Sequence, residues 1–129
     1  MSAADGSGDV ALVRRYLGCV ATHDWDGAAD CLTPDVVRVG PFGDTFTPRE
    51  PYLAHLAELM PSLPGYAMEI HRVVAQGGVA GRVVTAELTE TVEVDGRPLR
   101  TPEALVFDLG GDGRITRIAI YLQRRPDDG

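Results

Sequence analysis

A single glutamate interrupts an apolar alternation in the second half of the chain. Around Glu90, apolar side chains occupy every second position, at Val84, Ala86, Leu88, Val92 and Val94. This period of two is typical of a strand with one buried face. A carboxylate among Leu and Val loses hydration, which raises its pKa toward neutral and suits it to general acid or base catalysis. The alternative is that a bulge or bend turns Glu90 toward solvent.

Glu103 is a second acidic residue with the same kind of placement. Leu105, Phe107 and Leu109 continue its face of the next predicted strand. Glu103 is therefore a second candidate for acid-base chemistry. The alternative is a solvated side chain beside Pro102.

The three histidines form no pattern with other reactive side chains. His55 lies on a predicted helix three residues after Tyr52, His71 on a predicted strand, and His23 at a helix junction. Each is more often structural or exposed than catalytic. If one takes part, His55 or His71 is the candidate proton shuttle, because imidazole titrates near neutral pH.

Other reactive patterns are missing from the sequence. The cluster Gly110-Gly111-Asp112-Gly113 is a hairpin turn that no Gly-Lys-Ser/Thr follows, so it is not a phosphate loop. The serines lie in a tail or a Pro-rich turn, where a Ser-His-Asp triad is hard to build. Cys19 and Cys31 lack the spacing of a zinc site. We therefore expect no metal and no organic cofactor.

The chain has the size and composition of one small acidic domain. Its 129 residues are 44% hydrophobic and 24% charged, with a net charge of -7 at pH 7. Nucleic acids and anionic membranes attract cationic surfaces, so this charge argues against both as partners, and Arg124-Arg125 is the main basic cluster. No signal peptide or apolar run of about 20 residues is present, so we expect a cytoplasmic protein.

Three helices are predicted in the first half of the chain. Apolar spacing predicts helices over residues 9–22 and from Trp25 to Thr33-Pro34, with Asp24 as the N-cap of the second. The third helix begins at Thr47-Pro48-Arg49-Glu50, which has the form of a capping box with Pro at the first helical position, and prolines end it after Met60.

The strands are predicted mainly after the helices. A short strand ends at the Gly40-Pro41 corner, and four more are separated by turn sequences, near 66–75, 80–94, 99–109 and 114–123. This order predicts an α+β domain with an antiparallel meander. We expect a single domain over residues 9–125, with tails at 1–8 and 126–129.

The element order and one stretch of sequence resemble a known superfamily. Residues 14–43 read R-R-Y-L-G-C-V-A-T-H-D-W-D-G-A-A-D-C-L-T-P-D-V-V-R-V-G-P-F-G. This stretch resembles the nuclear-transport-factor-2-like superfamily, and especially its ketosteroid-isomerase and SnoaL-like polyketide-cyclase branches. The resemblance covers about residues 9–123. It implies a cone-shaped, curled antiparallel sheet wrapped around three N-terminal helices, an apolar pocket between sheet and helices, and a homodimer through the outer face of the sheet.

The resemblance assigns roles to two tyrosines and also shows two departures. In ketosteroid isomerases a helix-1 tyrosine and a protonated carboxyl group stabilise a developing enolate while a second carboxylate moves the proton. Tyr16 matches that tyrosine, and Tyr52 matches one that supports it. The alternative for Tyr16 is a core side chain whose hydroxyl bonds a neighbour. The corner base is Gly40 here and the protonated carboxyl falls on Leu105, so a standard ketosteroid isomerase is not expected.

Together these observations predict a cofactor-independent acid-base enzyme for a hydrophobic, oxygenated small molecule such as a polyketide, terpenoid or steroid-like compound. Glu90, or else Glu103, would move the proton, and Tyr16 would donate to the substrate oxygen in an isomerisation, cyclisation, dehydration or epoxide opening. The alternative is a non-catalytic ligand-binding or assembly module of the same fold. The expected pocket wall consists of Phe42, Tyr52, His55, Leu56, Met60, His71, Leu88, Leu105, Phe107, Ile118 and Ile120.

Overall fold

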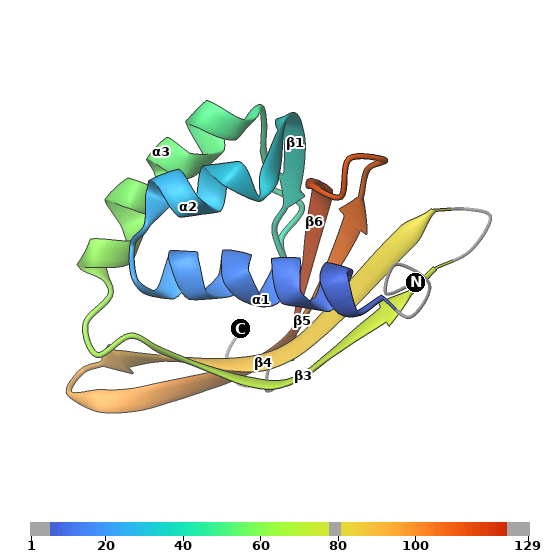
Figure 1. Ribbon diagram of the computed structural model, residues 1–129. Helices are drawn as coiled ribbons and strands as arrows, with labels where there is room; N and C mark the ends of the chain where they lie inside the picture. Colours follow the sequence, from blue (N-terminus) through green and yellow to red (C-terminus); the bar gives the residue numbers. More distant parts are fainter. Residues whose placement is uncertain (1–5, 78–80, 124–129) are drawn as a thin grey trace.

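The computed structural model describes residues 6–77 and 81–123, which form three α-helices and six strands (Figure 1). Residues 1–5, 78–80 and 124–129 lie outside this description, and with them most of the expected tails and Arg124-Arg125. Within the described ranges, no helix has the length and apolar character that crossing a membrane requires.

The first two helices are α1 (Ser7–Ala21) and α2 (Trp25–Asp30), close to the predicted ranges. α1 begins two residues earlier than expected, so its first turn takes up the end of the predicted tail. Asp24 caps α2 as predicted, because its carboxylate accepts a hydrogen bond from the Gly27 N–H at 2.9 Å.

The third helix, α3 (Arg49–Leu59), starts differently from the predicted capping box. Pro48 is its N-cap residue rather than its first helical residue, and no side-chain hydrogen bond caps the helix. Glu50 instead accepts a hydrogen bond from the neighbouring Arg49 at 2.9 Å. A short 3-10 turn, η2 (Met60–Ser62), ends this helical segment, as the nearby prolines predict.

The strands form one mixed sheet with the order β2-β1-β6-β5-β4-β3. The antiparallel run from β3 to β6 is the predicted meander. Two features were not predicted, since β1 pairs with β6 in parallel and β2 is an additional short strand. Turn residues predict pairing only between strands that a tight turn connects. β1 and β6 are far apart in the sequence, so turn residues could not predict this pairing. The bounds are β1 (Leu32–Val39), β2 (Thr45–Phe46), β3 (Ala67–Gln76), β4 (Arg82–Val94), β5 (Arg97–Leu109) and β6 (Ile115–Leu122).

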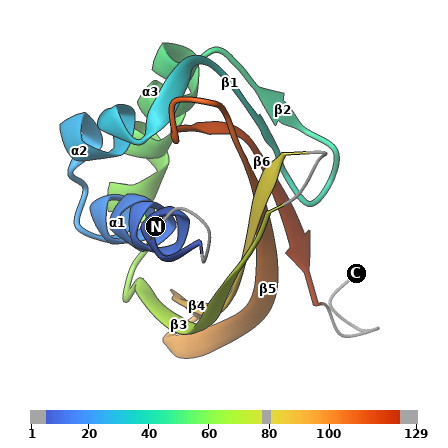
Figure 2. The same cartoon turned by 45° about the vertical axis from the view of Figure 1, so that its right-hand side comes forward.

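The sheet curls around the helices, and α1 lies inside the curve (Figure 2). Register shifts in β3, between Ile70 and Arg72, and in β6, between Ile115 and Arg117, mark irregularities of the kind that bend strands. The predicted α+β class, with a curled sheet around three helices, is confirmed. The space between them is filled by large buried side chains, including Phe107, Leu17, Leu32, Leu88, Ile115 and Ile118.

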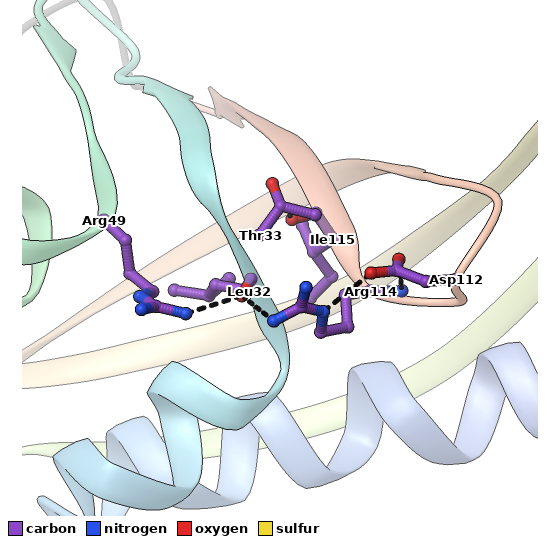
Figure 3. A network of polar contacts seen from close by, with 6 residues as sticks. All are labelled: Leu32, Thr33, Arg49, Asp112, Arg114 and Ile115. Atoms are coloured by element: carbon purple, nitrogen blue, oxygen red, sulfur yellow. Dashed lines mark hydrogen bonds and ion pairs between the residues drawn. The ribbon is translucent and has the colours of Figure 1, made fainter.

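Two arginines hold the start of β1 against its neighbours (Figure 3). Arg49 from α3 and Arg114 from the turn before β6 both donate to the carbonyl oxygen of Leu32, at 3.3 and 3.4 Å. Asp112 accepts a hydrogen bond from Arg114 at 2.8 Å and orients it. The β1–β6 ladder is irregular just after Leu32, so side-chain donors bond the backbone where strand pairing is interrupted.

Candidate active site

A pocket of about 260 Å³ opens on the inner face of the curled sheet. Its wall comes from β1, β4, β5 and β6, together with the β1–β2 loop and the segment between η2 and β3. The sheet and its loops therefore build this wall, beside the helices rather than beneath them. The lining residues are Arg38, Pro41, Leu63, Tyr66, Glu90, Val92, Leu99, Thr101, Glu103, Ile120 and Leu122.

Glu90 and Glu103 line this pocket from neighbouring strands. Glu90 lies opposite Thr101, and Glu103 lies opposite Leu88, so the two carboxyl groups are diagonal neighbours on the same inner face. Burial raises the pKa of Glu103 to about 9, and the charge of Glu90 and a hydrogen bond with it act in the same direction, while Arg38 acts in the opposite one. Near neutral pH, Glu103 therefore keeps its proton beside Glu90.

Tyr66 is the phenol that contacts this pair. Its hydroxyl donates a short hydrogen bond to Glu90 Oε2, and its side chain lines the pocket. Burial, followed by the charge of Glu90, raises the pKa of Tyr66, so the hydroxyl remains a donor. Tyr66 was not predicted as a site residue, although it is the first residue of the strand predicted near 66–75, because strand periodicity alone does not show which side chain lies opposite Glu90. The β3–β4 register, which pairs Met68 with Glu90, is the signal that would have placed this end of β3 near Glu90.

Tyr16 and Tyr52 form a separate, buried pair. Their hydroxyl oxygens are 2.5 Å apart, and the residues are 2% and 3% exposed. Burial is the main cause of the raised pKa of both hydroxyls. Tyr16 also packs edge-on against Phe107, with ring centroids 5.9 Å apart. Neither tyrosine lines the pocket, so Tyr16 has the position of a core tyrosine bonded to a neighbour, which was the alternative to substrate contact.

Arg38, on β1, brings a positive charge to the pocket wall. Its Nη1 donates to Asp44 Oδ2 at 2.9 Å, and its guanidinium carbon lies 5.7 Å from the centre of the Phe46 ring. Its Nε is buried without a hydrogen-bond partner among the described residues. Sequence analysis passed over the signal, which is an arginine within the apolar run Val36–Val39, where a buried charge requires a partner.

The Gly40 corner is filled by a carboxylate from further along the chain. A Cβ atom on residue 40 would lie only 2.3 Å from Asp44 Oδ1. The Gly40 N–H donates to the Asp44 carbonyl at 2.7 Å, and the Gly43 N–H donates to the Gly40 carbonyl at 3.1 Å. Glycine stands at this corner because Asp44 folds back over it and directs its carboxylate at Arg38.

The two histidines predicted to be near the substrate do not line the pocket. The His55 ring stacks on Phe46 with centroids 4.0 Å apart. His71 Nε2 lies 2.7 Å from Thr89 Oγ1 on the neighbouring strand, within hydrogen-bonding distance. Each ring therefore has a structural partner, as the alternative reading of the histidines expected.

The apolar residues predicted for the pocket wall divide between three environments. Ile120 lines the pocket as predicted. Phe42 is 72% exposed on the loop after β1. The others belong to the hydrophobic core cluster and do not line this pocket. These core residues are Leu56, Met60, Leu88, Leu105, Phe107 and Ile118.

Neither cysteine lines the pocket. Cys19 and Cys31 are free and buried, and burial is the main cause of the raised pKa of both thiols. Within residues 6–77 and 81–123, no group of three or more His, Cys, Asp or Glu side chains could hold a metal ion.

Known families and structures match the chain at the level of the fold. The model of the SnoaL-like domain matches residues 13–118, whereas no curated protein matches. An LEH-like epoxide hydrolase from M. tuberculosis is 22% identical, with 91% of this chain and 84% of that chain covered and a TM-score of 0.75. A protein with a ketosteroid-isomerase-like fold from Catenulispora acidiphila, in complex with trimethylamine, is 19% identical, with coverage of 85% and 83% and a TM-score of 0.69.

A nuclear-transport-factor-2-like protein of unknown function from Burkholderia xenovorans is 18% identical, with coverage of 94% and 87% and a TM-score of 0.71. At such identities these structures show the fold alone, which is the nuclear-transport-factor-2-like fold expected from the resemblance. Because the family model covers most of the chain, the protein belongs to the SnoaL-like domain family.

Proposed function

We propose that the protein is a cofactor-independent acid-base enzyme that opens the epoxide ring of a small hydrophobic molecule by adding water. The observation that supports this is that two carboxyl groups, Glu90 and Glu103, lie on the wall of one pocket, where burial raises the pKa of Glu103 to about 9. Epoxide opening uses both, because the epoxide oxygen gains a proton while water loses one. An isomerase moves one proton between two atoms of its substrate, which a single carboxylate can do.

The proposed reaction balances within this pair. Glu90 takes a proton from water while the water oxygen attacks one epoxide carbon. The bond from that carbon to the epoxide oxygen breaks, and Glu103 gives its proton to this oxygen, so that a diol forms. Tyr66 keeps Glu90 oriented through its hydrogen bond. The hydrogen bond between the two carboxyl groups then returns the proton from Glu90 to Glu103.

The pocket supports a small, uncharged substrate. Its volume of about 260 Å³ lies just below the roughly 300–1,000 Å³ of sites for drug-sized ligands. A compact molecule of one or two rings therefore suits it better than the polycyclic polyketide or steroid considered from sequence. Arg38 and Glu90 bring opposite charges to the same wall, so neither sign of ligand charge is favoured overall, and much of the remaining wall is apolar. The likeness to an LEH-like epoxide hydrolase agrees with this substrate class.

The test is diol formation from a panel of small epoxides, such as styrene oxide and cyclohexene oxide, measured by gas chromatography. Glu90→Gln and Glu103→Gln should each lower kcat/KM by about 10²-fold or more, whereas Glu58→Gln, on an exposed position of α3, should retain the wild-type rate. In ¹⁸O-labelled water, the first turnover should place label in the diol, because water attacks directly. Absence of diol from every epoxide, or unchanged rates in both pocket variants, would contradict the proposal.

A second candidate function is a non-catalytic binding module of the same fold. The Gly40 corner favours it, because the carboxylate there belongs to Asp44 and points at Arg38. This function predicts thermal stabilisation by small cyclic compounds without product formation, and to the same degree in Glu90→Gln and wild type.

The homodimer implied by the family resemblance stays a prediction. Tyr121, which is 59% exposed, alternates with the pocket residue Ile120 along β6 and so lies on the outer face of the sheet. Light scattering coupled to size-exclusion chromatography should give twice the mass of one chain, and a monomer would contradict the prediction.

A further inference from the structure

We propose that Asp44 is a positioning residue, which holds the Arg38 guanidinium at the pocket wall and offsets part of its charge, while Gly40 leaves the space that this requires. The catalytic meaning of this inference rests on the proposed function, because the group that it affects is the acid Glu103. Arg38 lies on β1, and Gly40 and Asp44 lie on the loop that follows it, whereas Glu90 and Glu103 lie on β4 and β5.

At this corner a side chain on residue 40 would collide with the Asp44 carboxylate in its present position. A Cβ atom on residue 40 would lie 2.3 Å from Asp44 Oδ1 and 2.7 Å from its Cγ, closer than van der Waals contact allows. Two backbone hydrogen bonds hold this loop: the Gly40 N–H donates to the Asp44 carbonyl oxygen, and the Gly43 N–H donates to the Gly40 carbonyl oxygen. They fix the backbone position from which the Asp44 side chain extends. The bare Cα of Gly40 then lets the carboxylate lie over the corner.

Arg38 depends on Asp44 for its position. The Arg38 side chain is 14% exposed and that of Asp44 is 48% exposed, so the arginine occupies the pocket side of the pair and the carboxylate the solvent side. Phe46 contacts the guanidinium from one face, and the buried Nε has no hydrogen-bond partner among the residues described. The bond from Nη1 to Asp44 at 2.9 Å is thus the directional contact that sets where the cation lies.

The position and charge of Arg38 matter for Glu103. The charged and titratable groups that face Glu103 are Glu90 on β4 and Arg38 on β1, with Tyr66 bonded to Glu90. Glu90 raises the pKa of Glu103, whereas Arg38 lowers it. If an uncharged acceptor replaced the Asp44 carboxylate, Arg38 would keep its hydrogen bond at the pocket wall but its charge would no longer be offset, so it would stabilise ionised Glu103 more strongly. Asp44 therefore helps Glu103 to keep the proton that the proposed reaction delivers.

The test is an NMR titration of the Glu103 carboxyl carbon in the full-length chain, assigned by its absence in Glu103→Gln. In Asp44→Asn the pKa of Glu103 should fall below its wild-type value of about 9. Gly40→Ala should act in the same direction, because its Cβ displaces the Asp44 carboxylate, and Arg38→Met should act in the opposite direction. Asp30→Asn is the matched control, since it removes a surface pair with Arg15 at 3.6 Å, and Gly18→Ala, with open space around its Cβ, controls for the added methyl group.

The outcomes separate this inference from the proposed function. An unchanged Glu103 pKa in Asp44→Asn, or an equal fall in Asp30→Asn, would overturn the inference. If Gly40→Ala does not fold, Asp44→Asn decides alone, because Asp44 lies on an exposed loop. The titration needs no substrate, so the expected shifts in a protein that makes no diol would support the Asp44 inference and contradict only the proposed reaction.

Discussion

Replacing the acid Glu103 by glutamine should make the protein more stable at neutral pH and less active. In wild type the folded state holds a proton on Glu103 up to a pKa of about 9, whereas the unfolded chain releases it near 4.5. Between these values folding must take up a proton, so stability falls as pH rises. Below about 4.5 both states are protonated, and above about 9 both are ionised, so the effect is absent at low pH and constant at high pH. Glutamine does not titrate and avoids this cost.

The size of this stability change follows from the difference between pH 7 and the pKa of about 4.5 that Glu103 has in the unfolded chain. Each pH unit costs about 1.4 kcal/mol, which sets a ceiling of about 3 kcal/mol at pH 7. Because the Glu103 side chain is only partly buried, water screens its charge and we expect about half of this, about 1 to 2 kcal/mol. For a domain of this size, that corresponds to a rise in Tm of about 4 to 8 °C.

The assay is urea denaturation of wild type and Glu103→Gln at several pH values from 4 to 9, followed by circular dichroism. The free-energy difference should grow with pH above about 4.5, while kcat for diol formation falls by about 10²-fold. The exposed Glu58→Gln change should alter neither quantity. A Glu103→Gln protein that is less stable than wild type at pH 7, or a difference that does not depend on pH, would refute the argument that Glu103 is buried with its proton.

Two further predictions concern the aromatic residues. Tyr66→Phe should lower kcat about ten-fold, because Glu90 loses the donor that orients it. Tyr16→Phe should affect kcat less. It should instead lower the free energy of unfolding by about 1–3 kcal/mol, since it leaves the buried Tyr52 hydroxyl without its partner. Steady-state kinetics and denaturation of both variants measure these effects. If Tyr16 were the substrate-binding phenol, Tyr16→Phe would lower kcat more than Tyr66→Phe does. Phe107→Ala should cost about 3–5 kcal/mol, because Phe107 is fully buried. A loss below about 1 kcal/mol in chemical denaturation would contradict its place in the core.

Local sequence patterns were enough to predict the fold class and to place both acids on inner faces of their strands. Apolar spacing marked the helices, and alternation marked the long strands, because each element must bury one face. The same alternation put Glu90 and Glu103 on inner faces, since side chains on a strand point to opposite sides in turn. The predicted capping box before α3 was wrong, because these residue types allow a side-chain cap without requiring one. In the structure Glu50 pairs with Arg49 instead.

The sequence by itself determined the order of the elements, the α+β class and the predicted inward direction of the two acids, because these depend on periodicity and on turns between near neighbours, whereas the curl of the sheet was implied only by the family resemblance. Tertiary structure decided what surrounds the acids. Tyr66, Arg38 and Glu103 meet at one pocket from segments whose association depends on strand pairing and curvature over long sequence separations. It also decided that Tyr16 is core and that Asp44 fills the Gly40 corner, because such contacts depend on how chain segments fold back over one another, which no local pattern records.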